Sequence, residues 1–245
     1  MQTSRTSDTR IDIAIPSPLH PQAPPEEFLD LLKHIEAKIS SLYSTAEART
    51  PAESPPPLSP RAYLKIYTRV HEYDIATRAQ DTEVPDEYLH HWLDSRIRGY
   101  CTKMRERISH DHGNNMEGTK TSFSRNLLAT YMSCYRKLCR LATFVGNLLQ
   151  SWERHVLRRE QGEKTCVSSV EGMHQIVGKE EVLGVDTHEA LPEDGLRDLK
   201  DAIAVLIETD AETREHDSDL VENVIESLSV LGFTVESRGS QRSWS

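Results

Sequence analysis

The sequence TSFSRNLLATYMSCYRKLCRLATFVGNLLQSWERHVLRR, residues 121–159, decides the fold. Its apolar residues recur at steps of three and four, from Phe123 and Leu127 to Trp152 and Val156, which is the period of one face of an α-helix. No proline interrupts the stretch. A helix of this length extends about 55 Å. Because such a rod cannot bury its apolar face alone, we expect shorter helices to pack along it.

The rest of the chain supplies helices of the required kind. Apolar residues at helical spacing predict them over residues 26–43, 60–78, 86–108, 192–209 and 217–231. Five prolines predict a loop over 46–60, and a polar, glycine-containing segment predicts another over 109–120. Gly172, Gly178 and Gly184 punctuate the apolar residues of 161–191, which we expect to be irregular. No segment alternates convincingly as a half-buried strand, so the sequence predicts an all-α fold.

Composition excludes several classes of protein. The net charge of −10 argues against a general nucleic-acid binder. The charge is uneven, since residues 120–160 are basic and 189–226 are acidic, and these segments are either solvated helix faces or a docking surface. The four cysteines form no CxxC pair, which favours reduced thiols in the cytoplasm or nucleus. No signal peptide or membrane span is apparent.

Motifs that carry chemistry are absent. The sequence contains no phosphate-binding loop, dinucleotide fingerprint, nucleophile elbow or zinc-protease motif. His110 and His112 offer two imidazoles to a metal, but the spacing places no third ligand nearby. We therefore expect no metal, no cofactor and no catalytic residue, which makes the protein a non-catalytic one.

The helix predicted over 60–78 has two faces with ordered side chains. By the spacing of a helix, residues 63, 67 and 71 lie on one side and residues 66, 70 and 73 on a neighbouring side. One reading places both sides in the core. The other packs one side inward and leaves the other for a partner.

Two strings in these helices resemble signatures of the cullin family. Residues 63–73, YLKIYTRVHEY, resemble the family's N-terminal Y-[LM]-x-[LI]-Y-T-x-V-[YH]-x-[YF]. Residues 153–160, ERHVLRRE, are similar to N-R-H-W-V-[RK]-R-E, and Tyr131 and Tyr135 fall at the positions of F-Y-x-x-x-W. Looser likenesses follow at residues 206–208 and 228–232. The likeness extends over residues 26–160 and, more loosely, 196–233.

The resemblance implies a scaffold arm of a multisubunit cullin–RING ubiquitin ligase that acts in ubiquitin-dependent protein catabolism. In such arms the first helical repeat grips a BTB-fold adaptor, and the Y-T-x-V-H string is closest to the cullins that work with F-box substrate receptors. Carried over by position, the residues that would bind the adaptor are Tyr63, Leu64, Ile66, Tyr67, His71, Ser151, Arg154 and Arg158.

Composition predicts the tails and the linker, and the resemblance implies the repeats. We expect a disordered tail over 1–25, a first cullin-like repeat over 26–160, an irregular linker over 161–191, helices of a partial second repeat over 192–233 and a second tail over 234–245. An incomplete repeat would leave its apolar face partly uncovered, which favours self-association.

The sequence departs from the family in ways that limit the expected function. Ser151 stands where the family usually has an aromatic residue, and Val156 replaces the tryptophan of the arginine–histidine string. No counterpart of the C-terminal cullin homology region follows, so we expect no RING subunit to bind and no ubiquitin transfer by this chain alone. A natural truncation, a decoy and an incorrectly predicted gene remain open, as does a generic helical-repeat interaction module outside the ubiquitin system.

Overall fold

The computed structural model describes residues 26–48, 58–80, 84–114, 119–160, 169–184, 194–208 and 211–234. Within these ranges the chain is built of seven helices and has no strand, so the expected all-α fold is confirmed. The helices are α1 (Glu26–Ala48), α2 (Pro60–Gln80), α3 (Val84–Asn114), α4 (Lys120–Glu160), α5 (Val170–Leu183), α6 (Asp194–Glu208) and α7 (Ala211–Val230). The expected tail over 1–25, residues 235–245 of the tail expected over 234–245, and residues 49–57 of the proline-rich loop lie outside the described residues.

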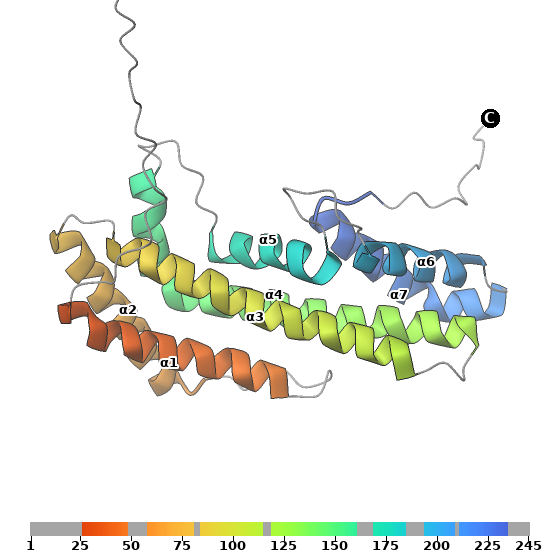
Figure 1. Ribbon diagram of the computed structural model, residues 1–245, viewed down its shortest axis with the longest axis horizontal. Helices are drawn as coiled ribbons and strands as arrows, with labels where there is room; N and C mark the ends of the chain where they lie inside the picture. The colour runs from red at the N-terminus through yellow and green to blue at the C-terminus, as the bar shows by residue number, and fades with distance from the viewer. Residues whose placement is uncertain are drawn as a thin grey trace, which may run out of the picture.

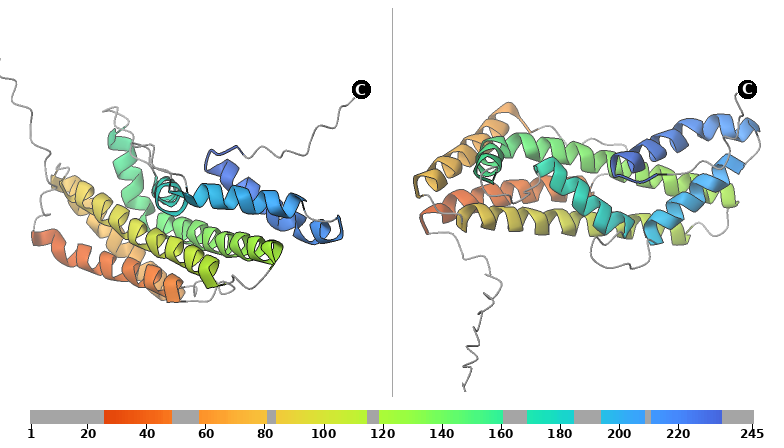
Figure 2. Two further views of the ribbon diagram at one scale, coloured as in Figure 1. Left: turned by 45° about the vertical axis from the view of Figure 1, so that its right-hand side comes forward. Right: turned by 90° about the horizontal axis from the view of Figure 1, so that it is seen from above.

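The long helix α4 organises the molecule, as its apolar period predicts. Its buried stripe, which includes Leu128, Val145 and Trp152, belongs to one core cluster to which every described helix contributes. Figure 1 shows the shorter helices distributed along this rod, with α1 and α2 at one end, α6 and α7 at the other and α5 between them. The two turned views in Figure 2 show the same elongated arrangement. The expected packing of α1, α2 and α3 against α4 is confirmed.

Local signals explain where the helices begin and end. The hydroxyl of Ser59 accepts a hydrogen bond from the amide of Ala62 at 3.2 Å, so Ser59 caps α2 and Pro60 occupies its first position, as expected. Two helices are longer than predicted. The helix α1 continues to Ala48, into the expected proline-rich loop, and α3 continues to Asn114, into the expected loop over 109–120.

The prediction of an irregular linker over 161–191 is wrong for residues 170–183, which form α5. Ser169 caps this helix by accepting from the amide of Gly172 at 3.0 Å. Gly184 ends it with a left-handed φ of 69°, a conformation that favours glycine. Gly178 lies inside the helix, where a Cβ would approach Leu138 of α4 to 2.8 Å. Gly178 therefore permits a close contact between helices and Gly184 provides a cap, so neither glycine interrupts α5.

Substitutions at two glycines, one in a crowded position and one in an open position, test the packing of the helices. At Gly195, a Cβ would lie 2.8 Å from the carbonyl oxygen of Val182, so Gly195→Ala should push α6 away from α5 and destabilise the fold by about 1–3 kcal/mol. At Gly99, an added Cβ would meet no atom within 4 Å beyond its own stretch of helix, and Gly99→Ala should stabilise α3 by about 0.5–1 kcal/mol. Urea unfolding of both variants measures the difference. A Gly195→Ala protein as stable as the parent would mean that α5 and α6 do not pack this closely.

The last two helices also differ from expectation. The helix α7 begins at Ala211, so Asp217 is not its cap. Instead the Asp217 carboxylate accepts two hydrogen bonds from Arg125 of α4, at 2.7 and 2.8 Å. The apolar stripe of α6 is largely buried, and in α7 Val221, Val224 and Leu228 are buried. Leu220, Ile225 and Leu231 of the α7 stripe are only partly buried, and Val230 is 58% exposed, so this stripe is covered in part, as expected. Self-association through residues 196–233 stays a prediction.

Candidate functional site

The helix α2 divides its side chains as the second of the two readings predicts. Ile66, Val70 and Tyr73 lie in the core with almost no exposed surface. Residues of the neighbouring side lie at or near the surface. One predicted adaptor-binding residue is therefore wrongly assigned: Ile66 is 1% exposed and packs inward, so it cannot contact a partner.

Tyr63 and Tyr67 form an aromatic pair at the junction of α2 and α4. Their rings stack with centroids 6.4 Å apart, and the ring of Phe144 meets Tyr63 edge-on at 6.1 Å. The Tyr63 hydroxyl donates to the carbonyl of Asn147 at 3.4 Å. Both tyrosines are half-buried, so neither the fully buried nor the fully exposed alternative describes them. The contacts of Tyr63 with α4, and the stack of Tyr67 on Tyr63, hold the pair in place while each side chain stays partly exposed.

The outer side of α2 carries apolar groups that nothing in the described structure covers. Leu64 is 60% exposed and Ile75 is 53% exposed, and the eleven-residue spacing between them places them on one stripe, with His71 in the same stripe. Ile75 was not predicted as a site residue, although its spacing from Leu64 was a usable signal. We call this surface the α2–α4 face. It consists of Tyr63, Leu64, Tyr67, His71 and Ile75 of α2 and Phe144, Ser151 and Arg154 of α4.

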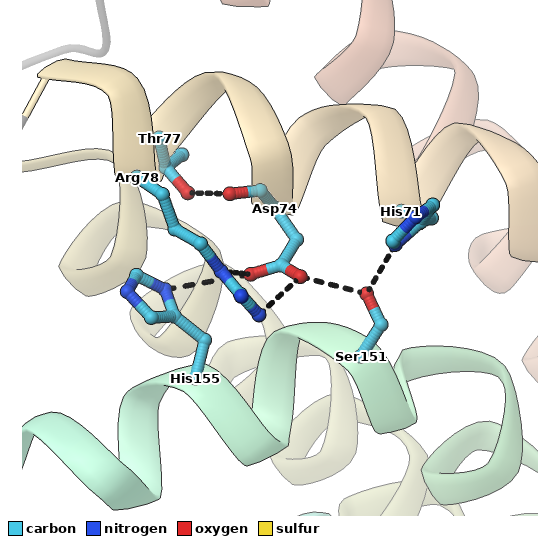
Figure 3. Close-up of polar contacts among 6 residues, drawn as sticks. All are labelled: His71, Asp74, Thr77, Arg78, Ser151 and His155. Carbon is cyan, nitrogen blue, oxygen red and sulfur yellow. Dashed lines mark hydrogen bonds and ion pairs between the residues drawn. The ribbon is translucent and has the colours of Figure 1, made fainter.

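A polar cluster fastens the last turns of α4 to α2. The fully buried carboxylate of Asp74 accepts two hydrogen bonds from Arg78, at 3.0 and 2.7 Å, and one from the hydroxyl of Ser151 at 3.0 Å. Nδ1 of His155 lies 3.4 Å from the same carboxylate. Figure 3 shows these side chains converging on Asp74 from both helices, with His71 beside Ser151. A buried carboxylate of this kind needs such partners to offset its desolvation.

The connectivity of this cluster does not match that of a catalytic triad. In a serine–histidine–aspartate relay the histidine accepts the serine proton and the aspartate orients the histidine. Here the Ser151 hydroxyl donates directly to Asp74, while His71 reaches only Ser151, at 3.5 Å. The described residues also contain no group of three or more potential metal-binding side chains. The cluster is therefore best understood as a clamp that positions the two walls of the α2–α4 face.

The remaining predicted residues are placed as follows. Arg154 is exposed, and its helical spacing puts it on the same side of α4 as Asn147 and Ser151. Ser151 is partly exposed, but its hydroxyl is engaged by Asp74. The side chain of Arg158 lies outside the described part of the structure. The sequence analysis did not identify Asp74, Arg78 and His155. Asp74 and Arg78 could have been recognised, because an acid and an arginine four residues apart on a helix commonly form an ion pair.

The surroundings of the face are basic, in contrast to the acidic chain as a whole. Arg61, Lys65 and Arg154 are exposed around it. Arg69 is exposed as well, but it pairs with Glu72 at 2.8 Å, and the charge of Asp74 is compensated by Arg78. The local charge is thus positive, which favours an acidic partner surface.

No protein-family model matches this chain, and no curated protein or solved structure matches it significantly. In the described part of the chain, no helix has the length and apolar character needed to cross a membrane. Fold and face together define the class: an all-α protein with a partly apolar, basic helical face at the junction of α2 and α4.

Proposed function

We propose that this chain is a cullin-like scaffold arm that docks a BTB-fold adaptor, and through it an F-box-type substrate receptor, on the α2–α4 face. The observation that carries the proposal is that four of the residues in the cullin-like string, Tyr63, Leu64, Tyr67 and His71, lie together at the surface. The second cullin-like string belongs to the helix that forms the adjacent wall.

The aromatic pair suits a docking role. Interface hot spots are enriched in aromatic and arginine side chains. The rings of Tyr63 and Tyr67 are already held by each other, by Phe144 and by the Asn147 carbonyl. A partner would therefore bind side chains that have little conformational freedom left to lose, which favours affinity.

The proposal assigns no catalytic step to the chain. The Asp74 clamp holds the geometry of the face, and the adaptor would be held by apolar contact with Leu64 and by charge complementarity with Lys65 and Arg154. The basic rim predicts that association slows as salt is added, because electrostatic steering acts on the association rate.

Two matched substitutions test the proposal. Leu64→Glu places a charge in the centre of the face, and because Leu64 is 60% exposed the fold should be unaffected. We expect affinity for a BTB-fold adaptor, measured by calorimetric titration, to fall at least about tenfold. Ile176→Glu is the control, since Ile176 is a 44% exposed residue of α5, outside the face.

The control protein should bind like the parent. Equal losses in both variants, or no adaptor binding by the parent, would count against the proposed function. A different outcome is that the chain fails to bind the adaptor and binds an unrelated protein, with that binding lost in Leu64→Glu but kept in Ile176→Glu. This result would identify an interaction module outside the ubiquitin system.

A further inference from the structure

A cavity of about 100 Å³ lies between α4 and α5, where the described structure encloses it on several sides. Leu138 and Ala142 of α4 form one wall, Gly178 and Val182 of α5 form another, and Leu231 at the end of α7 lies at its edge. The lining is predominantly apolar. Phe144 faces α2 on the other side of α4, so this α4–α5 cavity is separate from the α2–α4 face.

The backbone fixes the shape of the cavity. Gly178 has no Cβ, and one added there would come within 2.8 Å of Leu138, so the two helices lie as close as this position allows. Gly232 has a φ of 85°, and the amide of Phe233 bonds to the carbonyl of Leu228 at 2.9 Å, which turns the chain after α7 and positions Leu231. The walls are therefore set by packing and by a helix cap.

The polar groups of the cavity select the charge of a ligand. His174 is 1% exposed, and its ring nitrogens bond to the Val170 carbonyl and the Tyr43 hydroxyl, each at 2.7 Å, so the loss of hydration disfavours a charge on this ring. Glu171 is the one charged side chain among the described lining residues, and it is exposed. Tyr135, Thr143 and Gln175 add neutral polar groups. An anionic ligand is disfavoured here, whereas a cationic one is favoured.

We propose that the α4–α5 cavity binds a small aromatic amine, with the ring between Leu138, Ala142 and Val182 and the ammonium group toward Glu171. The cavity, at about 100 Å³, is smaller than an engineered apolar cavity of about 150 Å³ that binds benzene, so one six-membered ring is the largest group that it can accept. An apolar lining with a few polar groups is typical of ligand pockets, but the volume is well below the roughly 300–1,000 Å³ of sites for drug-sized ligands, which restricts the ligand to a single small ring.

Nuclear magnetic resonance titration of the full chain with benzylamine, benzyl alcohol and benzoate tests the proposal. We expect saturable shifts of the amides of residues 138–142 and 175–182, with a dissociation constant on the order of 1 mM for benzylamine. Benzyl alcohol should bind about two- to fivefold more weakly, and benzoate more weakly still. Glu171→Gln should remove the preference for the amine over the alcohol.

Filling the cavity gives the decisive comparison. Ala142→Leu should abolish the shifts, whereas Ala129→Leu, the same change at an exposed position of α4 outside the cavity, should leave them intact. Thr143→Phe, at the exposed mouth, provides a second blocking variant if Ala142→Leu does not fold. Unchanged binding after blocking, absence of saturable binding by the parent, or tighter binding of benzoate than of benzylamine would each overturn the proposal.

Discussion

Lowering the pH from 7 to 4 is expected to reduce the free energy of unfolding by roughly 3 kcal/mol through His174 alone. His174 is 1% exposed, and Nδ1 lies 2.7 Å from the Val170 carbonyl, which can only accept. Nδ1 therefore carries the proton, and Nε2 accepts from the Tyr43 hydroxyl at 2.7 Å. The neutral ring satisfies both contacts, whereas a protonated ring would place a charge that has lost its hydration in the core.

Burial lowers the pKa of His174 to about 4, although the Val170 carbonyl and the nearby Glu171 carboxylate oppose the shift. The pKa in the unfolded chain is about 6.5. Between these values the unfolded chain binds a proton that the folded chain does not, so stability rises with pH across this window. The stability is fully present above about pH 6.5 and is lost as the pH falls toward 4.

Urea unfolding at several pH values, on the parent and on His174→Gln, measures this effect. Glutamine keeps a donor and an acceptor but does not titrate, so the difference between the two proteins isolates His174 from the carboxylates that also titrate in acid. The variant should show a flatter dependence between pH 4 and 6.5. A His174 resonance that titrates near 6.5 in the folded parent would contradict the assignment.

Changing Tyr63 and Tyr67 together to alanine should weaken adaptor binding by about 1000-fold. Aromatic hot spots contribute about 2 kcal/mol or more each, and 1.4 kcal/mol corresponds to a factor of ten. The double change also removes the stack between the rings and the edge-on contact with Phe144. Because both tyrosines are half-buried, we expect a loss of stability of about 1–2 kcal/mol, less than the 3–5 kcal/mol of a buried aromatic residue.

Thermal melting and adaptor titration on the same double variant separate the two contributions. A folded protein that binds the adaptor as the parent does would exclude the tyrosines from the interface. A protein that no longer folds would show that their structural role outweighs any docking role, and Leu64→Glu would then carry the test.

Periodic apolar residues were enough to predict the all-α fold and the long helix, because a stripe such as that from Leu128 to Trp152 can be buried only in helical form. The same spacing predicted that α2 has one buried side and one side at the surface. The match to the cullin-like string did not predict that Ile66 packs inward, because a sequence motif does not distinguish residues that face a partner from residues that pack in the core beneath them.

The misses have specific physical causes. In α5, Gly178 lowers helical propensity, but it permits a close approach to Leu138 that offsets the lost propensity. Because Leu138 lies forty positions earlier, the local sequence around Gly178 does not reveal this contact. Asp217 resembles a helix cap by type, yet Arg125 engages it across the bundle. The Asp74 clamp joins residues about 80 positions apart, at Ser151 and His155, and such pairings appear only when the helices are placed.

The most direct test asks where on the surface a BTB-fold adaptor binds. The methyl resonances of the full chain, recorded during titration with the adaptor, report this location. Leu64 and Ile75, on the α2–α4 face, should shift and broaden, while Ile176 of α5 and Val230 of α7, which are also exposed, should not change. Saturation at one adaptor per chain with this pattern is the predicted result. Perturbation centred on Ile176 or Val230, with Leu64 and Ile75 unchanged, would contradict the central claim.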